Sequence, residues 1–129
     1  MNIWLWIAIA SGGALGAMSR FAFSHLIYQW LGREFVWGTL AVNIVGSFVF
    51  GLLTVWLVEK WALSLEWRMF FLIGFLGAFT TFSTFAFDTY MYLETGEYLK
   101  ALWNMLFSLV GTVIAMGLGI WVAKTFVSS

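Results

Sequence analysis

Four long apolar runs, separated by three short connections, constrain the fold of this chain more than any other feature. The runs cover about residues 3–30, 38–58, 69–93 and 98–126, and the connections read LGREFVW, EKWALSLEWR and ETGE. A helix crosses the hydrocarbon core of a bilayer with about 20 apolar residues, so each run is long enough for one span. Only 9% of the residues are charged, which is too few to cover a surface that faces water. We therefore predict an all-α integral membrane protein, with one membrane domain of four antiparallel helices over residues 1–129.

The rest of the composition excludes several classes of function. The chain has no cysteine, one histidine and no carboxylate cluster with the spacing of metal ligands, which excludes thiolate chemistry and a side-chain metal centre. The four spans leave no room for a soluble catalytic domain, so we expect no enzyme and no nucleic-acid partner. The small residues AIAS near the N-terminus follow no Lys or Arg, so we expect a retained first helix rather than a cleaved signal peptide.

Basic residues are balanced between the two sides of the predicted bundle. One side carries Lys60, Arg68 and Lys124, and the other carries Arg33, Lys100 and, if its side chain snorkels to the interface, Arg20. The positive-inside rule gives no orientation for such a distribution. Either a real preference is hidden in this small sample, or the chain inserts in both orientations and pairs as an antiparallel, dual-topology homodimer.

Small and polar residues stand out within the first two runs. Glycines at helical spacing, such as Gly12 with Gly16, indicate close helix packing. Asn43 lies inside the second run, with Thr39 one turn before it and Ser47 one turn after it on the same face. A buried amide needs partners, which an interhelical hydrogen bond or a polar cavity for an anion would equally provide.

The third run combines glycines, hydroxyls and phenylalanines. Gly74 and Gly77 are the expected sites of a break in the third helix, because the chain has no proline. A break would free carbonyl groups that suit an alkali cation, and the half-helix that begins near Thr80 would turn its positive end towards an anion. Four hydroxyls follow within five positions, at Thr80, Thr81, Ser83 and Thr84.

Phenylalanines recur every third residue beside these hydroxyls, at Phe79, Phe82 and Phe85, so we expect them to share one face. The edge of an aromatic ring carries positive charge, and hydroxyls can replace a hydration shell, so this face predicts a path for a small anion. Asp88 lies one turn beyond Thr84, either in the membrane or solvated at its interface. Ser108 and Thr112 of the fourth run either extend the polar stripe or bond to their own backbone.

Three motifs resemble the signatures of the small fluoride channels of the Fluc or CrcB family. They are GGALGAMSRF at Gly12–Phe21, GTLAVNIVGSFVFG at Gly38–Gly51 and GFLGAFTTFSTF at Gly74–Phe85. The resemblance implies an antiparallel, dual-topology homodimer with two pores in the inner membrane of a prokaryote. It also implies passive export of fluoride, which accumulates in the cytoplasm after HF has entered as a neutral acid.

The same resemblance assigns roles to individual residues. It implies that Phe82 and Phe85 line the pore with Asn43 beside them, and that Ser83, Thr84 and the position of Asp88 form a polar track. It implies that the backbone carbonyls of Gly77 and Thr80 hold one structural Na⁺ at the dimer centre. Ser108 would lie near a vestibule, and Arg20 and Thr39 match positions of the first two motifs. Some members carry Glu where this chain has Asp88.

Two other classes of function compete with this interpretation. A small proton-coupled multidrug exporter needs a carboxylate within the membrane, normally in its first helix, and the first two runs contain no acid except Glu34 in the connection and Glu59 at the end. A helical assembly subunit without a transport role would leave the hydroxyl cluster unexplained.

Overall fold

The computed structural model describes residues 2–128, and helices account for nearly all of them. The elements are α1 (Ile3–Leu31), α2 (Trp37–Val55), η1 (Trp56–Lys60), α3 (Leu65–Arg68), η2 (Met69–Leu76), α4 (Gly77–Phe79), α5 (Phe82–Glu94) and α6 (Tyr98–Ser128). The two η elements are π-helices. Within the described residues there is no strand, so the all-α prediction is confirmed.

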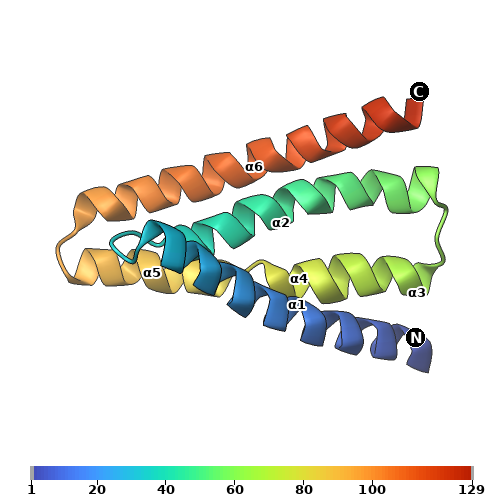
Figure 1. Ribbon diagram of the computed structural model, residues 1–129, viewed down its shortest axis with the longest axis horizontal. Coiled ribbons are helices and arrows are strands. Elements are labelled where there is room, and N and C mark those ends of the chain that lie inside the picture. Colours follow the sequence, from blue (N-terminus) through green and yellow to red (C-terminus); the bar gives the residue numbers. More distant parts are fainter. Residues whose placement is uncertain (1, 129) are drawn as a thin grey trace.

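These elements join into four helices that are long and apolar enough to cross a membrane. They cover Ile3–Leu31, Trp37–Lys60, Leu65–Glu94 and Tyr98–Val127. The third helix begins at Leu65, before the expected start at residue 69, because Ser64 is extended and ends the preceding connection. Both termini lie at the same end of the bundle, as four crossings require (Figure 1). The chain is a multi-pass membrane protein.

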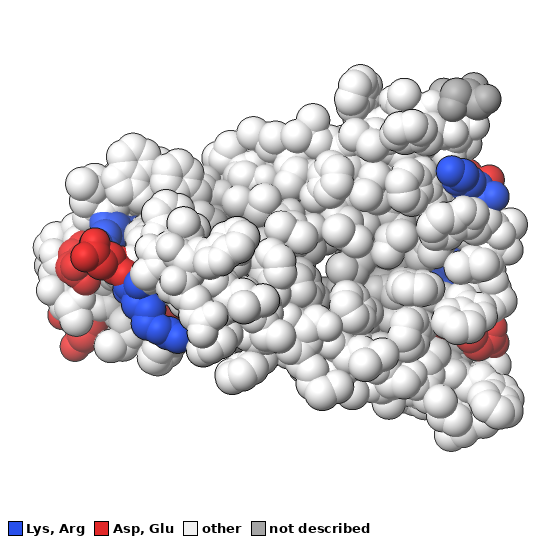
Figure 2. Space-filling view, in the orientation of Figure 1, with Lys and Arg blue, Asp and Glu red and all other residues white. Residues whose placement is uncertain are grey.

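Charged side chains gather at the two ends of the bundle, with an uncharged belt between them (Figure 2). Tryptophans are exposed near the ends of the spans, for example Trp4, Trp30, Trp61 and Trp121. This arrangement is the one that a bilayer favours, because lipid tails face the belt and headgroups face the charges and aromatic rings.

Glycines bring the helices into close contact at two interfaces. A Cβ atom on Gly16 of α1 would overlap with the carbonyl oxygen of Phe75 in η2. A Cβ atom on Gly119 of α6 would likewise overlap with the carbonyl oxygen of Phe48 in α2. The backbones therefore touch directly at both places, and the close packing that the glycines predicted is confirmed.

The third membrane helix is interrupted at Thr80 and Thr81, and we call these two residues the break. Thr80 has φ −88° and ψ 158°, and Thr81 has φ −151° and ψ 120°, so both are extended. The glycines were expected to break the helix, and this prediction is wrong. Gly77 is helical with φ −61° and ψ −35°, and Gly74 packs against Gly12 of α1. Extended dihedral angles are open to any residue, so the break does not need glycine.

Candidate functional site

Asn43 of α2 binds both peptide groups of Thr81 in the break. Its side-chain NH₂ donates to the Thr81 carbonyl at 3.0 Å, and the Thr81 N–H donates to Asn43 Oδ1 at 2.8 Å. Asn43 is buried, with 8% of its surface exposed. The expected interhelical hydrogen bond is therefore present, and it uses one of the two amide hydrogens of Asn43.

Thr81 also starts the helix that follows the break. Its hydroxyl accepts a hydrogen bond from the N–H of Thr84 at 3.2 Å, which makes Thr81 the N-cap of α5. Threonine is a favoured N-cap because its side-chain oxygen satisfies a free N–H group of the first turn. The cap and the Asn43 amide thus give partners to the N–H groups of Thr81 and Thr84 at the break.

The carbonyl groups that lose their helical donors at the break include those of Gly77 and Thr80. In a continuous helix the N–H of Thr81 would bond to the Gly77 carbonyl, and the N–H of Thr84 to the Thr80 carbonyl. Here these N–H groups bond to Asn43 Oδ1 and to the Thr81 hydroxyl instead. The carbonyl oxygens of Gly77 and Thr80 are the two that the motif resemblance assigned to a sodium ion.

The phenylalanines around the break lie in two different places. Phe82 and Phe85 contact each other with ring centroids 5.3 Å apart, and Phe82 is 73% exposed whereas Phe85 is 8% exposed. Phe79 is buried and packs its ring against Phe23 of α1 and against Phe75. The prediction that all three rings share one face is wrong, because the break changes the direction of the chain between Phe79 and Phe82.

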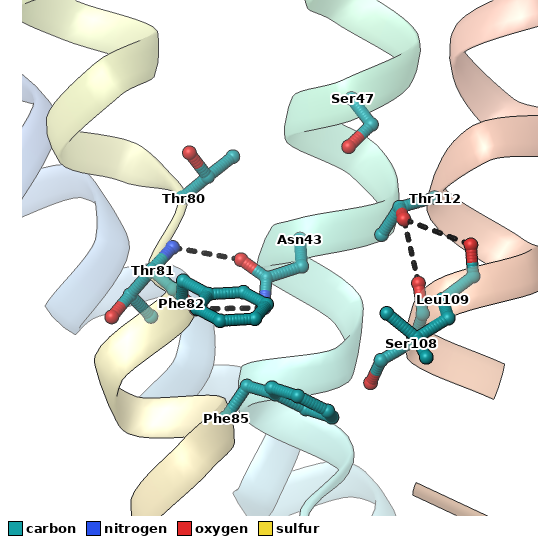
Figure 3. Close-up of a pocket in the computed structure, with 9 residues that line it drawn as sticks. All are labelled: Asn43, Ser47, Thr80, Thr81, Phe82, Phe85, Ser108, Leu109 and Thr112. Atoms are coloured by element: carbon teal, nitrogen blue, oxygen red, sulfur yellow. Dashed lines mark hydrogen bonds between the residues drawn. The ribbon is translucent and has the colours of Figure 1, made fainter. Parts of the chain in front are cut away.

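A cavity of about 200 Å³ lies beside the break, between α2, α5 and α6, and we call it the first cavity (Figure 3). The residues that line it are Asn43, Ser47, Thr80, Thr81, Phe82, Phe85, Ser108, Leu109 and Thr112. The first cavity brings together the predicted amide, both predicted rings and Ser108. None of the lining residues among those described is charged, so an ion in the first cavity would meet only amide, hydroxyl, backbone, ring and aliphatic groups.

A chain of buried hydrogen bonds runs from α5 to Ser108 of α6, which lines this cavity. The Thr89 hydroxyl donates to the Phe85 carbonyl, the Asn104 amide donates to Thr89 Oγ1 at 2.9 Å, and the Ser108 hydroxyl donates to Asn104 Oδ1 at 3.2 Å. Asn104 is 1% exposed, yet the sequence analysis missed it. Its spacing of one turn from Ser108 and two turns from Thr112 was the signal that could have found it.

A second cavity, of about 310 Å³, lies on the other side of Thr81. It is lined by Ala17, Arg20, Phe21, Ser24, Thr39, Val42, Thr81 and Thr84. The half-buried side chain of Arg20 lines this cavity, and its Nε atom has no hydrogen-bond partner in residues 2–128. Three predicted positions, Arg20, Thr39 and Thr84, therefore meet here rather than in the first cavity.

Ser83 and Asp88 line neither cavity. Ser83 is exposed, and its hydroxyl lies 3.4 Å from that of Thr81. Asp88 is half-buried beside Thr39, and its Oδ2 atom is buried without a hydrogen-bond partner in the described part of the chain. The described residues also contain no group of three His, Asp or Glu side chains that could hold a metal ion.

Comparison with known proteins assigns the chain to a family. The model of "CrcB-like protein, Camphor Resistance (CrcB)" matches residues 7–120. A protein of Hydrogenovibrio crunogenus named "Fluoride-specific ion channel FluC" is 52% identical over 95% of this chain and 92% of its own length.

Two further relatives carry the same name. That of Methylococcus capsulatus is 48% identical over 96% of this chain, which spans 54% of that relative. That of Magnetococcus marinus is 44% identical over 92% of this chain and 95% of its own length. These relatives are named as ion channels, not as enzymes or exporters. The matches extend over both cavities and the break, and the chain belongs to the CrcB family.

Proposed function

We propose that this protein is a fluoride-selective channel that conducts fluoride passively across the membrane. The observation that carries the proposal is the first cavity, which presents amide, hydroxyl and ring groups at a helix break within a membrane span. Fluoride is small and strongly hydrated, so it crosses only where hydrogen-bond donors replace its water. The edges of Phe82 and Phe85 add positive charge without offering a transferable proton. The names of the relatives support the same ion.

The proposed working unit is an antiparallel homodimer. Phe82 lines the first cavity and yet is 73% exposed, so one protomer alone would open this polar cavity towards lipid. A second copy that covers this face would enclose the cavity on both sides. Basic residues lie at both ends of the helix bundle, with Arg33 and Lys100 at one end and Lys60, Arg68 and Lys124 at the other. This near balance supports insertion in both orientations.

One structural Na⁺ ion is proposed at the centre of this dimer. Sodium is a hard cation that prefers oxygen ligands, and the carbonyl oxygens of Gly77 and Thr80 have lost their helical donors. Non-helical backbone within a membrane is stable only where protein or a cavity satisfies it. Two carbonyl groups from each copy would coordinate the ion. The ion would in turn replace the N–H donors that these carbonyl groups have lost.

In the cell, the proposed role is protection against fluoride. HF crosses membranes as a neutral weak acid and dissociates in the more alkaline cytoplasm, where the anion is trapped. A passive channel in the inner membrane of a prokaryote would let the trapped fluoride leave down its electrochemical gradient.

Ion efflux from liposomes tests the proposed function. Purified protein is reconstituted, the liposomes are loaded with fluoride or chloride, and ion-selective electrodes record the efflux after a potassium ionophore removes the voltage. We expect rapid fluoride efflux and no chloride efflux above that of protein-free liposomes. Equal efflux of both ions, or no fluoride efflux, would show that the proposal is wrong.

A further inference from the structure

Most hydroxyl groups that line the first cavity cannot donate a hydrogen bond to an ion, because each already donates its proton within the protein. Thr80 donates its proton to the Leu76 carbonyl, and Thr81 donates to Thr84 Oγ1. On α6, Thr112 donates to the Ser108 carbonyl at 2.6 Å. A hydroxyl has one proton, so these three groups present only oxygen lone pairs to an ion in the cavity.

The proton of Ser108 is also used in a hydrogen bond within the protein. The direction of this bond follows from the other end of the hydrogen-bond chain, which is the Phe85 carbonyl. The Phe85 carbonyl can only accept, so Thr89 must donate to it. Thr89 Oγ1 then accepts from the Asn104 NH₂ group, which turns Asn104 Oδ1 towards Ser108. That oxygen can only accept, so Ser108 gives its proton to Asn104 and none to the cavity.

Ser47 is the exception among the hydroxyls of this cavity. Hydroxyls in membrane helices commonly donate to a carbonyl three or four residues earlier. Ser11, Ser24, Thr54, Thr89 and Thr112 do so here. Ser47 makes no such bond within residues 2–128, and its side chain lines the first cavity one turn from Asn43 (Figure 3). Ser19 also lacks such a bond, but it lines neither cavity.

We propose that the Ser47 hydroxyl is a further hydrogen-bond donor to the conducted anion in the first cavity, beside the Asn43 amide that the sequence already placed in the ion path. This inference rests on the proposed fluoride function and names a donor that serves it. The two residues are one turn apart on the same face of α2, and both side chains line the first cavity. An anion in this cavity therefore lies within reach of donors from both residues, and a hydrogen bond to an anion is stronger than one between neutral groups. The hydroxyls of Ser108 and Thr112 face the anion only with lone pairs.

The concentration dependence of fluoride transport tests this assignment. The half-saturating fluoride concentration of the initial efflux rate is measured for Ser47→Ala in liposomes. A hydrogen bond to a charged group contributes enough that its loss weakens binding roughly tenfold or more. We expect a rise of about fivefold or more for Ser47→Ala and for Ser47→Cys, which keeps the size of the side chain but is a weak donor.

Three variants serve as comparisons in the same assay. Ser11→Ala, the same substitution at a hydroxyl bonded to the Ile7 carbonyl, is expected to leave the value unchanged. Ser47→Thr keeps a hydroxyl and should stay closer to the wild type than Ser47→Ala. Thr112→Val removes a proton that is already committed, so its effect should be smaller than that of Ser47→Ala.

The outcomes separate this inference from the proposed function. If the wild-type protein conducts no fluoride, the proposed function fails and this assignment with it. If the wild type conducts fluoride and Ser47→Ala shifts the value by less than about fivefold, only the assignment of Ser47 is overturned. A larger effect of Thr112→Val than of Ser47→Ala would also overturn it, because the donor would then lie on α6. If Ser47→Ala does not fold, Ser47→Cys decides by the same criteria.

Discussion

Replacement of Asn43 by alanine is the sharpest test of how the break is held. The substitution removes two hydrogen bonds, of 3.0 Å and 2.8 Å, and leaves the N–H and the carbonyl of Thr81 without side-chain partners. An unsatisfied buried polar group costs about 1–3 kcal/mol, and only the N–H is left without any partner, because the carbonyl of an N-cap residue also accepts the first hydrogen bond of its helix. Side-chain hydrogen bonds measured in membrane helices average about 0.6 kcal/mol, which gives about 1.2 kcal/mol.

The structure decides between these estimates. Thr81 lines both cavities, so water can reach its peptide groups and replace part of what Asn43 provides. We therefore expect Asn43→Ala to lower the free energy of unfolding by about 1–3 kcal/mol. We also expect it to abolish fluoride efflux, because the Thr81 N–H is then free to bond to the Gly77 carbonyl and close the helix.

Two measurements check this expectation. Unfolding in mixed detergent micelles gives the free energy, and liposome efflux gives the conduction. Asn43→Asp is an informative comparison, because it retains the acceptor for the Thr81 N–H but loses the donor to the Thr81 carbonyl. Thr54→Ala, on the same helix with a hydroxyl bonded to the Phe50 carbonyl, serves as the control. An Asn43→Ala protein with wild-type stability and wild-type efflux would refute the role of Asn43 in holding the break.

Three further changes have defined expected results. Phe82→Ile should strongly reduce fluoride efflux but leave the helical content and the elution volume unchanged, because isoleucine removes the ring and keeps an apolar side chain at this position. Undiminished efflux would remove this ring from the ion path. Gly16→Val should lower the free energy of unfolding by about 1–3 kcal/mol, because a side chain there overlaps with the Phe75 carbonyl. Wild-type stability would contradict the close contact of α1 with η2. Exchange of Na⁺ for a large organic cation should lower the thermal unfolding midpoint, since the carbonyl groups of Gly77 and Thr80 then lack a ligand, and an unchanged midpoint would argue against the ion.

The helices were predictable because lipid imposes a simple requirement on each of them. A run of about 20 apolar residues predicts a transmembrane helix, whatever other helices pack against it. The π-helical turns of η1 and η2 were not predicted, since one extra residue in a turn leaves no mark on a uniformly apolar sequence. The start of the third helix at Leu65 was missed for a similar reason, because Glu66 and Arg68 make its first turn look like a connection.

Several residues that the sequence singled out lie together in the structure, but their arrangement was not predictable. Asn43 and Ser108 are polar exceptions in apolar runs, whereas Phe82 and Phe85 were singled out by their spacing beside the hydroxyls. All four residues line the first cavity. We predicted the break at Gly74 and Gly77 because glycine adopts a wider range of backbone conformations than any other residue. Its actual position follows from a pairing of Thr81 with Asn43, which are 38 positions apart, and a local pattern cannot report such a contact. Asn104 was missed for the same reason, since its partner Thr89 lies on another helix.

The two extended residues of the break also determine how deep α5 sits in the membrane. An extended residue advances the chain by about 3.3 Å, whereas a helical residue advances it by about 1.5 Å. Thr80 and Thr81 therefore displace everything after them by about 3.6 Å relative to an uninterrupted helix. The break thus works as a spacer that sets the level at which Phe82 and Phe85 face α2 and α6. The length of this spacer, as much as the chemistry of its hydroxyls, is what keeps the rings level with Asn43.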